Sequence, residues 1–329
     1  MKNNIISFLT ITLVVISVTL LGSQNAQAQE EPTFSVAGTV DTYYRSSEFA
    51  PGTSFANLNG FALGMANIVL SYEGEKSGFV ADLVYGPRGA DAVFGSTGSS
   101  SIVNQLYVYY NVSDSFTLTL GNFNTFLGYE VISPAANFNY STSYMFSYGP
   151  FSHTGLKADI SVSDDVSLML GVLNTTDATE AQPADDDYMF GAQLGLYGQY
   201  INLLTGQGAT QIDFTGGLDI SDSFFLGVNA TSYEDDTIEF SGVALYPQYS
   251  FSDTFALGVR YEAFTENGEL GAFGDGDNTS FTITGSLTSG NMTIKPEFRI
   301  DSASDKFYTD ADGATDSLSS FVVAAIYSF

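Results

Sequence analysis

Apolar and polar residues alternate with a period of two along most of the chain, in short segments separated by turns. The last segment is the plainest case, with apolar residues at every second position: Phe321, Val323, Ala325, Tyr327 and Phe329. Side chains of a β-strand alternate between its two faces, so these five share one face. After Gln29 no apolar run is long enough for a transmembrane helix. The pattern therefore predicts an all-β protein.

One turn sequence recurs between the segments, in the form apolar-Ser-Asp-polar-apolar. It occupies residues 112–116, 162–166, 220–224 and 251–255. Ser and Asp side chains bond to nearby backbone groups and so favour tight turns. In outer-membrane barrels such short turns lie on the periplasmic side, and longer loops lie outside. Placing the recurrent turns at one end gives every strand a direction.

Composition separates the two folds that such a pattern allows, a β-sandwich and a closed barrel. Charged residues are only 14% of the chain, which is low for a soluble protein. The chain also has 27 Phe, 20 Tyr and 33 Gly. A sandwich needs two closed apolar layers, whereas the second face of most strands here is polar or small. We therefore predict a transmembrane antiparallel β-barrel, with lipid outside and water inside.

The alternating segments predict about sixteen strands, an even number as in single-chain bacterial barrels. They cover residues 34–44, 61–72, 78–85, 102–112, 116–123, 153–162, 166–174, 188–198, 200–204, 210–220, 224–232, 239–251, 254–265, 278–288, 291–301 and 318–329. The pair 188–198 and 200–204 is the least regular, so fourteen or eighteen strands stay open.

The N-terminus has the three parts of a signal peptide. Lys2 gives a positive start, residues 5–21 are mainly apolar, and Ala26 and Ala28 give the small-x-small cleavage pattern. We expect residues 1–28 to be removed and residues 29–329 to form the barrel; the alternative is a retained anchor. The absence of Cys excludes a lipoprotein, disulfides and Cys-ligated metal sites.

The longest connection, residues 124–152, follows the fifth predicted strand and is too apolar for an exposed loop. Its aromatic residues include Phe126, Tyr129, Phe138, Tyr140, Tyr144, Phe146, Tyr148 and Phe151. Loops of this length in compact domains are usually packed or functional. We expect this one to fold into the lumen and to place Glu130, Tyr140 and Tyr144 at a constriction.

Alternation also assigns the side chains that point into the lumen. Of the eight Lys and Arg residues beyond Lys2, five are expected inside: Arg45, Lys157, Arg260, Lys295 and Arg299. The same faces carry Asp41, Tyr43, Asp159, Glu262, Glu297 and Asp301. We expect these residues to line the pore. Two interpretations stay open: the charges simply avoid lipid, or a basic wall faces the long loop and sets up a transverse field.

No catalytic, metal or cofactor site is expected. The only His is His153, and its neighbour Ser152 points to the opposite face of the strand. We expect His153 to be structural. Residues 310–316 resemble part of a calcium loop but lack the full pattern, so we expect a solvated acidic loop. The formal net charge of −28 repels nucleic acid and attracts cations. Solubility in a salty habitat explains this charge equally well.

Three segments carry a family resemblance. Residues 137–158, residues 121–130 and residues 38–44 resemble motifs of the OmpL-like β-barrel porin family, and the best match covers 121–158. The resemblance implies a porin of Gram-negative bacteria and names no solute. A constriction loop in this interval is likewise a feature of sixteen-stranded porins. The alternating last strand resembles the assembly signal of outer-membrane barrels, with Phe321, Tyr327 and Phe329 as its aromatic residues.

We predict a porin of the outer membrane, a passive diffusion channel for small hydrophilic solutes and ions. The main alternative is a closed structural or adhesive barrel, because the sequence does not tell whether the long loop seals the lumen. A gated uptake receptor would need a large N-terminal plug domain, and a barrel enzyme is disfavoured by the single His. The expected partners are membrane lipids, the barrel assembly machinery and small solutes, with a homo-oligomer compatible with the sequence.

Overall fold

The computed structural model of the chain describes residues 32–181, 187–268 and 276–329. The predicted signal peptide lies outside these residues. Of the helices within them, none has the length and apolar character needed to cross a membrane.

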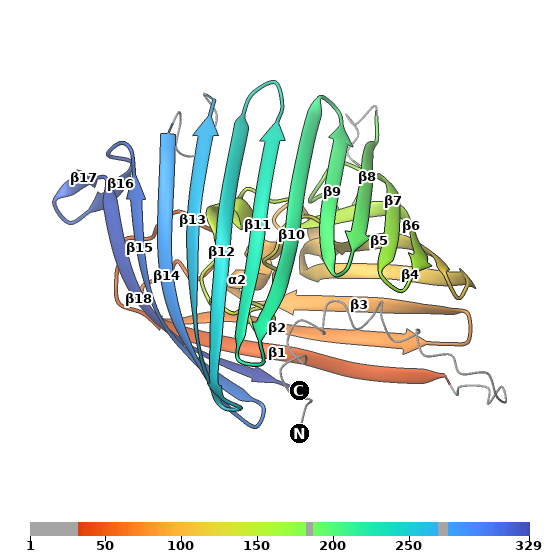
Figure 1. The fold of residues 1–329 in the computed structure, drawn as a ribbon, viewed down its shortest axis with the longest axis horizontal. Helices are drawn as coiled ribbons and strands as arrows, with labels where there is room; N and C mark the ends of the chain where they lie inside the picture. The colour runs from red at the N-terminus through yellow and green to blue at the C-terminus, as the bar shows by residue number, and fades with distance from the viewer. Residues whose placement is uncertain (1–31, 182–186, 269–275) are drawn as a thin grey trace.

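A closed antiparallel barrel forms the body of the molecule (Figure 1). Its strands are β1 (Thr33–Arg45), β2 (Gly60–Glu73), β3 (Ser77–Tyr85), β4 (Val103–Ser113), β5 (Phe116–Asn124), β6 (Ser152–Ser163), β7 (Val166–Leu173), β8 (Met189–Leu196), β9 (Gln199–Gly206), β10 (Ala209–Ser221), β11 (Phe224–Glu234), β12 (Glu239–Ser252), β13 (Phe255–Asn267), β14 (Gly276–Ser289), β15 (Met292–Ala303) and β18 (Ser317–Ser328). Each strand pairs with its neighbours in sequence, and β1 pairs with β18 to close the ring. The prediction of sixteen strands is confirmed, the less regular pair β8 and β9 included.

The alternation of faces along the strands follows the sequence pattern. In β15, Phe298 and Ile300 are about 40% exposed on the outer surface, at 41% and 39%. Glu297 and Arg299, between and beside them, are each 1% exposed and point inward. A strand places successive side chains on opposite sides, so a single apolar series covers the outside of the wall.

The recurrent Ser-Asp turns close hairpins at one end of the barrel, which we call the turn end. At all four, the register of the two strands shifts just before the turn. In two of these turns the first Ser hydroxyl accepts a backbone hydrogen bond from the residue three positions later, as Ser221 does from the N–H of Phe224 at 3.1 Å. Ser252 accepts in the same way from Phe255 at 3.1 Å. The predicted turns therefore form, with a β-bulge built into each.

The opposite end, which we call the loop end, carries structure that the sequence pattern did not indicate. A short helix, α2 (Pro87–Ala92), and a 3-10 turn, η1 (Gly98–Ile102), lie between β3 and β4. A small hairpin of β16 (Tyr308–Asp310) and β17 (Gly313–Thr315) stands between β15 and β18. It contains the acidic stretch predicted as a solvated loop, whose Asp312 is exposed.

Candidate functional site

Residues 125–151, between β5 and β6, fold into the lumen and are called the inserted loop below (Figure 1). The predicted inward-folded loop is confirmed. It contains a single helical turn, α3 (Tyr144–Ser147), capped by the Ser143 hydroxyl, which accepts from Phe146 N at 3.0 Å. Tyr140 and Tyr144 are both 0% exposed. The predicted constriction residues of this loop are therefore packed inside protein.

The two ends of the inserted loop are joined at its base. Thr125 N donates to the Phe151 carbonyl at 2.9 Å, and the Thr125 hydroxyl lies 2.9 Å from His153 Nε2. Asp177, from the loop between β7 and β8, accepts from Phe151 N at 2.6 Å and Ser152 N at 2.9 Å. Burial raises the pKa of Asp177 to about 6, although these two bonds oppose the rise. His153 is fully buried here, with its ring 5.0 Å from that of Phe126.

Arg260 of β13 makes the central contact between the wall and the inserted loop. Its guanidinium lies 2.5 Å from the Glu130 carboxylate, and both side chains are almost completely buried. Arg260 also donates to the carbonyls of Ser141 at 2.7 Å and Thr142 at 3.1 Å. One wall side chain therefore holds two parts of the loop that are eleven residues apart in sequence.

Wall carboxylates bind the backbone N–H groups of the same loop. Glu297 accepts from Tyr140 N at 2.7 Å and from Ser141 N at 3.0 Å. Glu262 accepts from Tyr144 N at 2.9 Å and from the next residue, Met145, at 2.8 Å. Buried carboxylates are expensive unless hydrogen-bonded, and these are satisfied by the loop backbone. The loop and the charged wall therefore require each other.

Wall cations bind the carbonyl groups of the loop in the complementary way. Arg299 donates to the Thr142 carbonyl at 2.6 Å and pairs with Asp301 on its own strand at 2.7 Å. Lys295 donates to the Pro134 carbonyl at 2.9 Å and also to that of Asn137.

Two further Arg residues, Arg88 and Arg45, hold other segments of the loop end. Arg88 of α2 donates to the Ile132 carbonyl at 3.0 Å, and its guanidinium lies over the Phe55 ring at 4.4 Å. Arg45 holds the loop between β1 and β2 through the carbonyls of Ser47, Phe49 and Asn57.

Tyrosine hydroxyls complete the attachment. Tyr140 donates to Asp41 at 2.5 Å, and its ring packs 5.6 Å from that of Tyr43. Tyr144 donates to Asp301 at 2.9 Å and lies 2.7 Å from the Tyr308 hydroxyl of β16. All members of the predicted inner set except Lys157 and Asp159 are at most 5% exposed.

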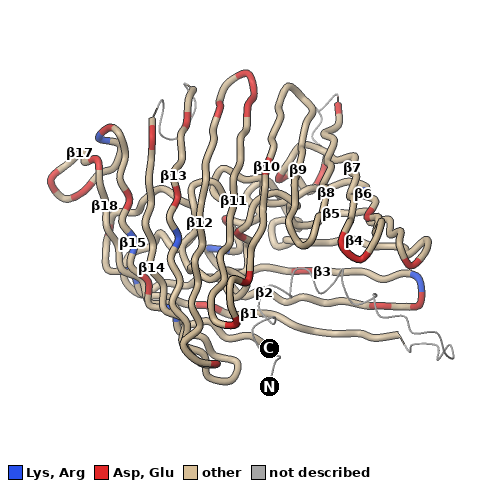
Figure 2. Tube along the Cα trace, in the orientation of Figure 1, with Lys and Arg blue, Asp and Glu red and all other residues tan. Residues whose placement is uncertain are grey.

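Lys157 and Asp159 of β6 form an inner ion pair that keeps contact with solvent. Their charged groups are 2.5 Å apart, and their side chains are 13% and 24% exposed. Lys157 also lies over the Phe123 ring at 5.4 Å. In the order of strands around the ring, β6 lies across the lumen from β13 to β15, where the loop is anchored. This partly exposed pair therefore lies opposite the strands that anchor the loop. Figure 2 shows the complementary distribution, with most acids at the loops and turns.

Glycines on the inner face of the wall make room for the loop, and our sequence analysis missed them. A Cβ at Gly258 would lie 2.4 Å from the Phe138 ring, and one at Gly242 would lie 2.7 Å from Met145. One at Gly227 would lie 2.5 Å from the Tyr129 hydroxyl. The detectable signal is a Gly at an inward position on three successive strands, β11 to β13. Arg88 was also missed, because α2 was not predicted.

The last strand closes the barrel at its predicted terminal aromatic residue. Phe329 N donates to the Gly38 carbonyl and Gly38 N donates to the Phe329 carbonyl, each at 3.0 Å. Phe321, Tyr327 and Phe329 are 40%, 46% and 52% exposed on the outer surface.

Comparison with known proteins supports the architecture. A family model described as "Putative beta-barrel porin-2, OmpL-like" matches residues 33–329. The outer membrane channel DcaP of Acinetobacter baumannii is 12% identical, with a TM-score of 0.62, over 94% of this chain and 100% of that one. The anion-selective porin from Comamonas acidovorans is 11% identical, with a TM-score of 0.59, over 91% and 100%. OmpT of Vibrio cholerae in its trimer form is 13% identical, with a TM-score of 0.55, over 91% and 99%. No curated protein matches the chain.

Proposed function

The chain belongs to the family of putative OmpL-like β-barrel porins, and from this membership we propose that it is a narrow diffusion channel of the outer membrane. The solutes are small, hydrophilic molecules and ions that pass through water inside the barrel. The similar solved structures share only the fold at these identities, so the proposal depends on the lumen of this chain.

The observation that carries the proposal is the one-sided attachment of the inserted loop. The charged side chains of β13 and β15 are buried in contacts that hold the loop. The Lys157–Asp159 pair across the lumen stays partly exposed. A path along the β6 side would be lined by one positive and one negative side chain. We propose that permeating ions contact this pair directly. The buried charges of β13 and β15 affect the ions only indirectly.

Cysteine substitution tests this path, because the chain has no native Cys. We expect Lys157→Cys, in purified full-length protein in a planar bilayer, to react with a charged, water-soluble thiol reagent and to lose conductance. Leu156→Cys is the matched control, since Leu156 is the preceding residue and is 46% exposed on the outer face. Its conductance should not change. Reaction at Lys157→Cys without loss of conductance would place the path elsewhere.

A closed structural or adhesive barrel is the second candidate, and the packing of the inserted loop favours it. Four buried apolar clusters lie around the loop, and all four include its residues together with wall residues: Ile132 with Met65, Tyr144 with Phe264, Tyr140 with Tyr43, and Leu127 with Leu173. A correctly folded protein that gives no conductance steps at any voltage would support this candidate over the channel.

Export, location and assembly are part of the proposal. We propose that the chain is cleaved after Ala28 and inserted in the outer membrane. The start of β1 and the end of β18 would then lie at the periplasmic side. The assembly machinery would recognise the last strand. The trimer form of the similar Vibrio cholerae protein motivates a test for a homo-oligomer by light scattering of the purified protein. The N-terminal sequence of the mature protein tests the cleavage site directly.

A further inference from the structure

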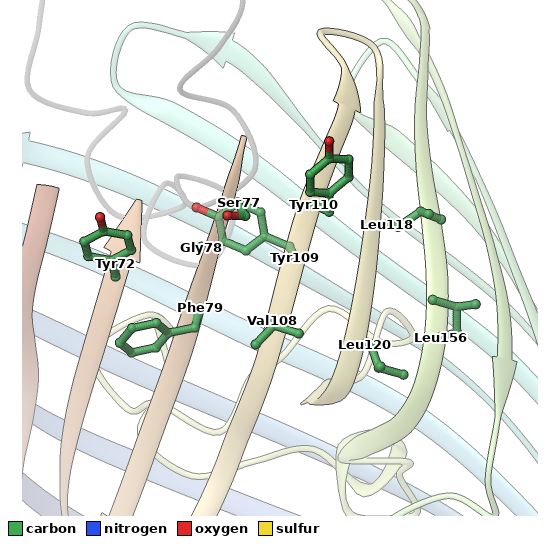
Figure 3. A pocket seen from close by; sticks show the side chains of 10 residues that line it. All are labelled: Tyr72, Ser77, Gly78, Phe79, Val108, Tyr109, Tyr110, Leu118, Leu120 and Leu156. Atoms are coloured by element: carbon green, nitrogen blue, oxygen red, sulfur yellow. The ribbon is translucent and has the colours of Figure 1, made fainter. Parts of the chain in front are cut away.

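Two neighbouring hollows lie on the outer face of the wall, away from the lumen. The first, of about 410 Å³, runs across β2 to β6, and Figure 3 shows the side chains that line it. The second, of about 450 Å³, runs across β5 to β9. Both are lined by Leu118 and Leu156, so they form one continuous groove. The groove is almost entirely apolar and faces the hydrocarbon of a membrane-spanning barrel.

Strand register explains why the wall is hollow here. Residues that pair across successive strands form a row around the barrel. One row holds bulky side chains, running through Tyr72, Phe79, Val108, Leu120, Leu156, Val172 and Phe190. The next row toward the turn end mixes large with small residues, running through Ser77, Tyr110, Leu118, Ala158, Leu170 and Ala192. The small side chains of Ser77, Ala158 and Ala192 leave the groove between the larger ones.

The groove opens toward the turn end, where its lining becomes polar. Tyr72, Ser77 and Tyr110 supply hydroxyl groups there, and Tyr side chains in barrels concentrate at the membrane interface. An apolar trough that ends in hydroxyl groups matches a molecule with a hydrocarbon chain and a polar head. Packing against apolar side chains gives no hydrophobic gain inside a membrane, so shape and headgroup contacts decide what binds.

The turn beside the groove carries both signs of charge. Lys76, next to Ser77, is exposed, and among the described residues it is the single Lys or Arg in a loop or turn at the turn end. Glu73 and Glu75 precede it in the same hairpin and are also exposed. A hairpin that presents a cation together with carboxylates complements a headgroup that carries a phosphate and an amine together. It would repel a purely anionic headgroup more strongly than a zwitterionic one.

We propose that this groove binds a phospholipid of the leaflet that the turn end faces, with a phosphate and a primary amine in its headgroup. One acyl chain lies across β3 to β6 in the groove, the phosphate contacts Lys76, and the amine contacts Glu73 or Glu75. The proposal goes beyond the channel function and requires only that the barrel spans a membrane.

Photo-cross-linking tests the proposal on the full chain in phospholipid nanodiscs. The probe is a phosphatidylethanolamine with a diazirine midway along one acyl chain, and the labelled peptides are mapped by mass spectrometry. We expect labels to concentrate on β3 to β6. Lys76→Gln should weaken labelling about fivefold, the effect of one basic side chain near a lipid surface. Ala158→Phe should fill the groove and reduce labelling there several-fold.

Ala325→Phe is the matched control, because Ala325 lies in the outer apolar series of β18, on another part of the wall. It should leave labelling of β3 to β6 unchanged. Lys76 is in an exposed turn, so its variant tests the proposal even if the Ala158 variant does not fold. Labels spread around the wall in proportion to outer area would overturn the proposal. So would cross-links from this groove to a second copy of the chain, which would make it a protein interface.

Discussion

The guanidinium of Arg260 on β13 lies 2.5 Å from the carboxylate of Glu130 in the inserted loop, and both side chains are almost completely buried. The pair joins a wall strand to a loop 130 residues earlier in the chain. Removing one partner of a buried pair leaves the other charge unpaired in a dry site, which typically costs about 3–5 kcal/mol. A single substitution at this contact should therefore loosen the loop.

We predict that Glu130→Gln destabilises the folded protein and loosens the inserted loop. The expected result is a fall in unfolding free energy of about 3 kcal/mol and larger fluctuations of the open-channel current. Urea unfolding in detergent and single-channel recording measure the two effects. Lys157→Gln is the control, since a partly exposed pair contributes about 1 kcal/mol or less. An equal fall in unfolding free energy in the two variants would contradict the assigned role of the Arg260–Glu130 pair.

The sequence was sufficient to predict the barrel strands and faces, but it did not predict the partners of the inner charges. Arg260, Glu262 and Arg299 alternate with apolar residues, so their inward direction follows from the period of two. Their partners include the Glu130 carboxylate and backbone groups of residues 141–144, which are more than a hundred residues away and irregular in conformation. No local pattern encodes such contacts, because they depend on how the loop folds.

For the same reason, the sequence did not predict which inward side chains stay exposed to solvent. Alternation places Lys157 and Lys295 on the same inner face in the same way. Lys295 is 3% exposed under the Pro134 and Asn137 carbonyls, whereas the side chain of Lys157 is 13% exposed. The difference arises because the inserted loop covers Lys295 and leaves Lys157 in partial contact with solvent. An aromatic excess predicted that the loop packs inside, but did not indicate against which strands.

Deleting residues 134–148 should increase single-channel conductance several-fold, because this segment fills the lumen beside β13 to β15. The deletion also exposes Arg299 and Lys295, which lose their carbonyl partners at Thr142 and Pro134. Conductance in planar bilayers measures the change. Heat-dependent gel mobility should first show that the barrel still forms. Unchanged conductance in an intact barrel would mean that the segment does not narrow the path.

Replacing Phe329 with Ser should impair assembly in the outer membrane more than folding in detergent. The backbone bonds between Phe329 and Gly38 survive the substitution, since both use main-chain atoms. The aromatic ring, 52% exposed on the outer surface, is lost. We therefore expect little heat-modifiable barrel in cell envelopes but normal refolding of the purified chain. Normal amounts in the envelope would show that the terminal ring is not needed for assembly.

Acidification should tighten the base of the inserted loop through Asp177. The pKa of Asp177 is raised by burial to about 6, above its ordinary value of 3.8. The folded protein therefore binds a proton between roughly pH 4 and pH 6 that the unfolded chain has released. The contribution of Asp177 to stability falls as pH rises through this window and stays low above it.

Hydrogen exchange measures this effect at the two amides that Asp177 binds, those of Phe151 and Ser152. Their protection factors should be higher at pH 5 than at pH 7.5, by an amount corresponding to at most roughly 2–3 kcal/mol. Other groups titrate in the same range, so the informative quantity is the difference from Asp177→Asn. That variant should lose the pH dependence at these amides. If it retains the full dependence, another group is responsible.

The acids at the loop end concentrate cations at the mouth, and the inner pair of β6 is balanced. Glu234, Asp236 and Glu239 are exposed around the loop between β11 and β12. Their field extends about 8–10 Å at physiological salt, so it acts mostly before the constriction. Arg260 and Arg299 carry buried counter-charges and contribute little there.

We therefore predict weak cation selectivity at low salt that fades as the salt concentration rises. The reversal potential across a KCl gradient measures it. Lys157→Gln should increase the preference for cations, because it leaves Asp159 unpaired on the solvent-exposed side of the lumen. Asp159→Asn should shift the reversal potential in the opposite direction. Arg299→Lys keeps the charge at a buried site, so it is the control that should leave selectivity unchanged. Clear anion selectivity of the unmodified protein at low salt would mean that buried basic residues of β13 and β15 control the pore instead.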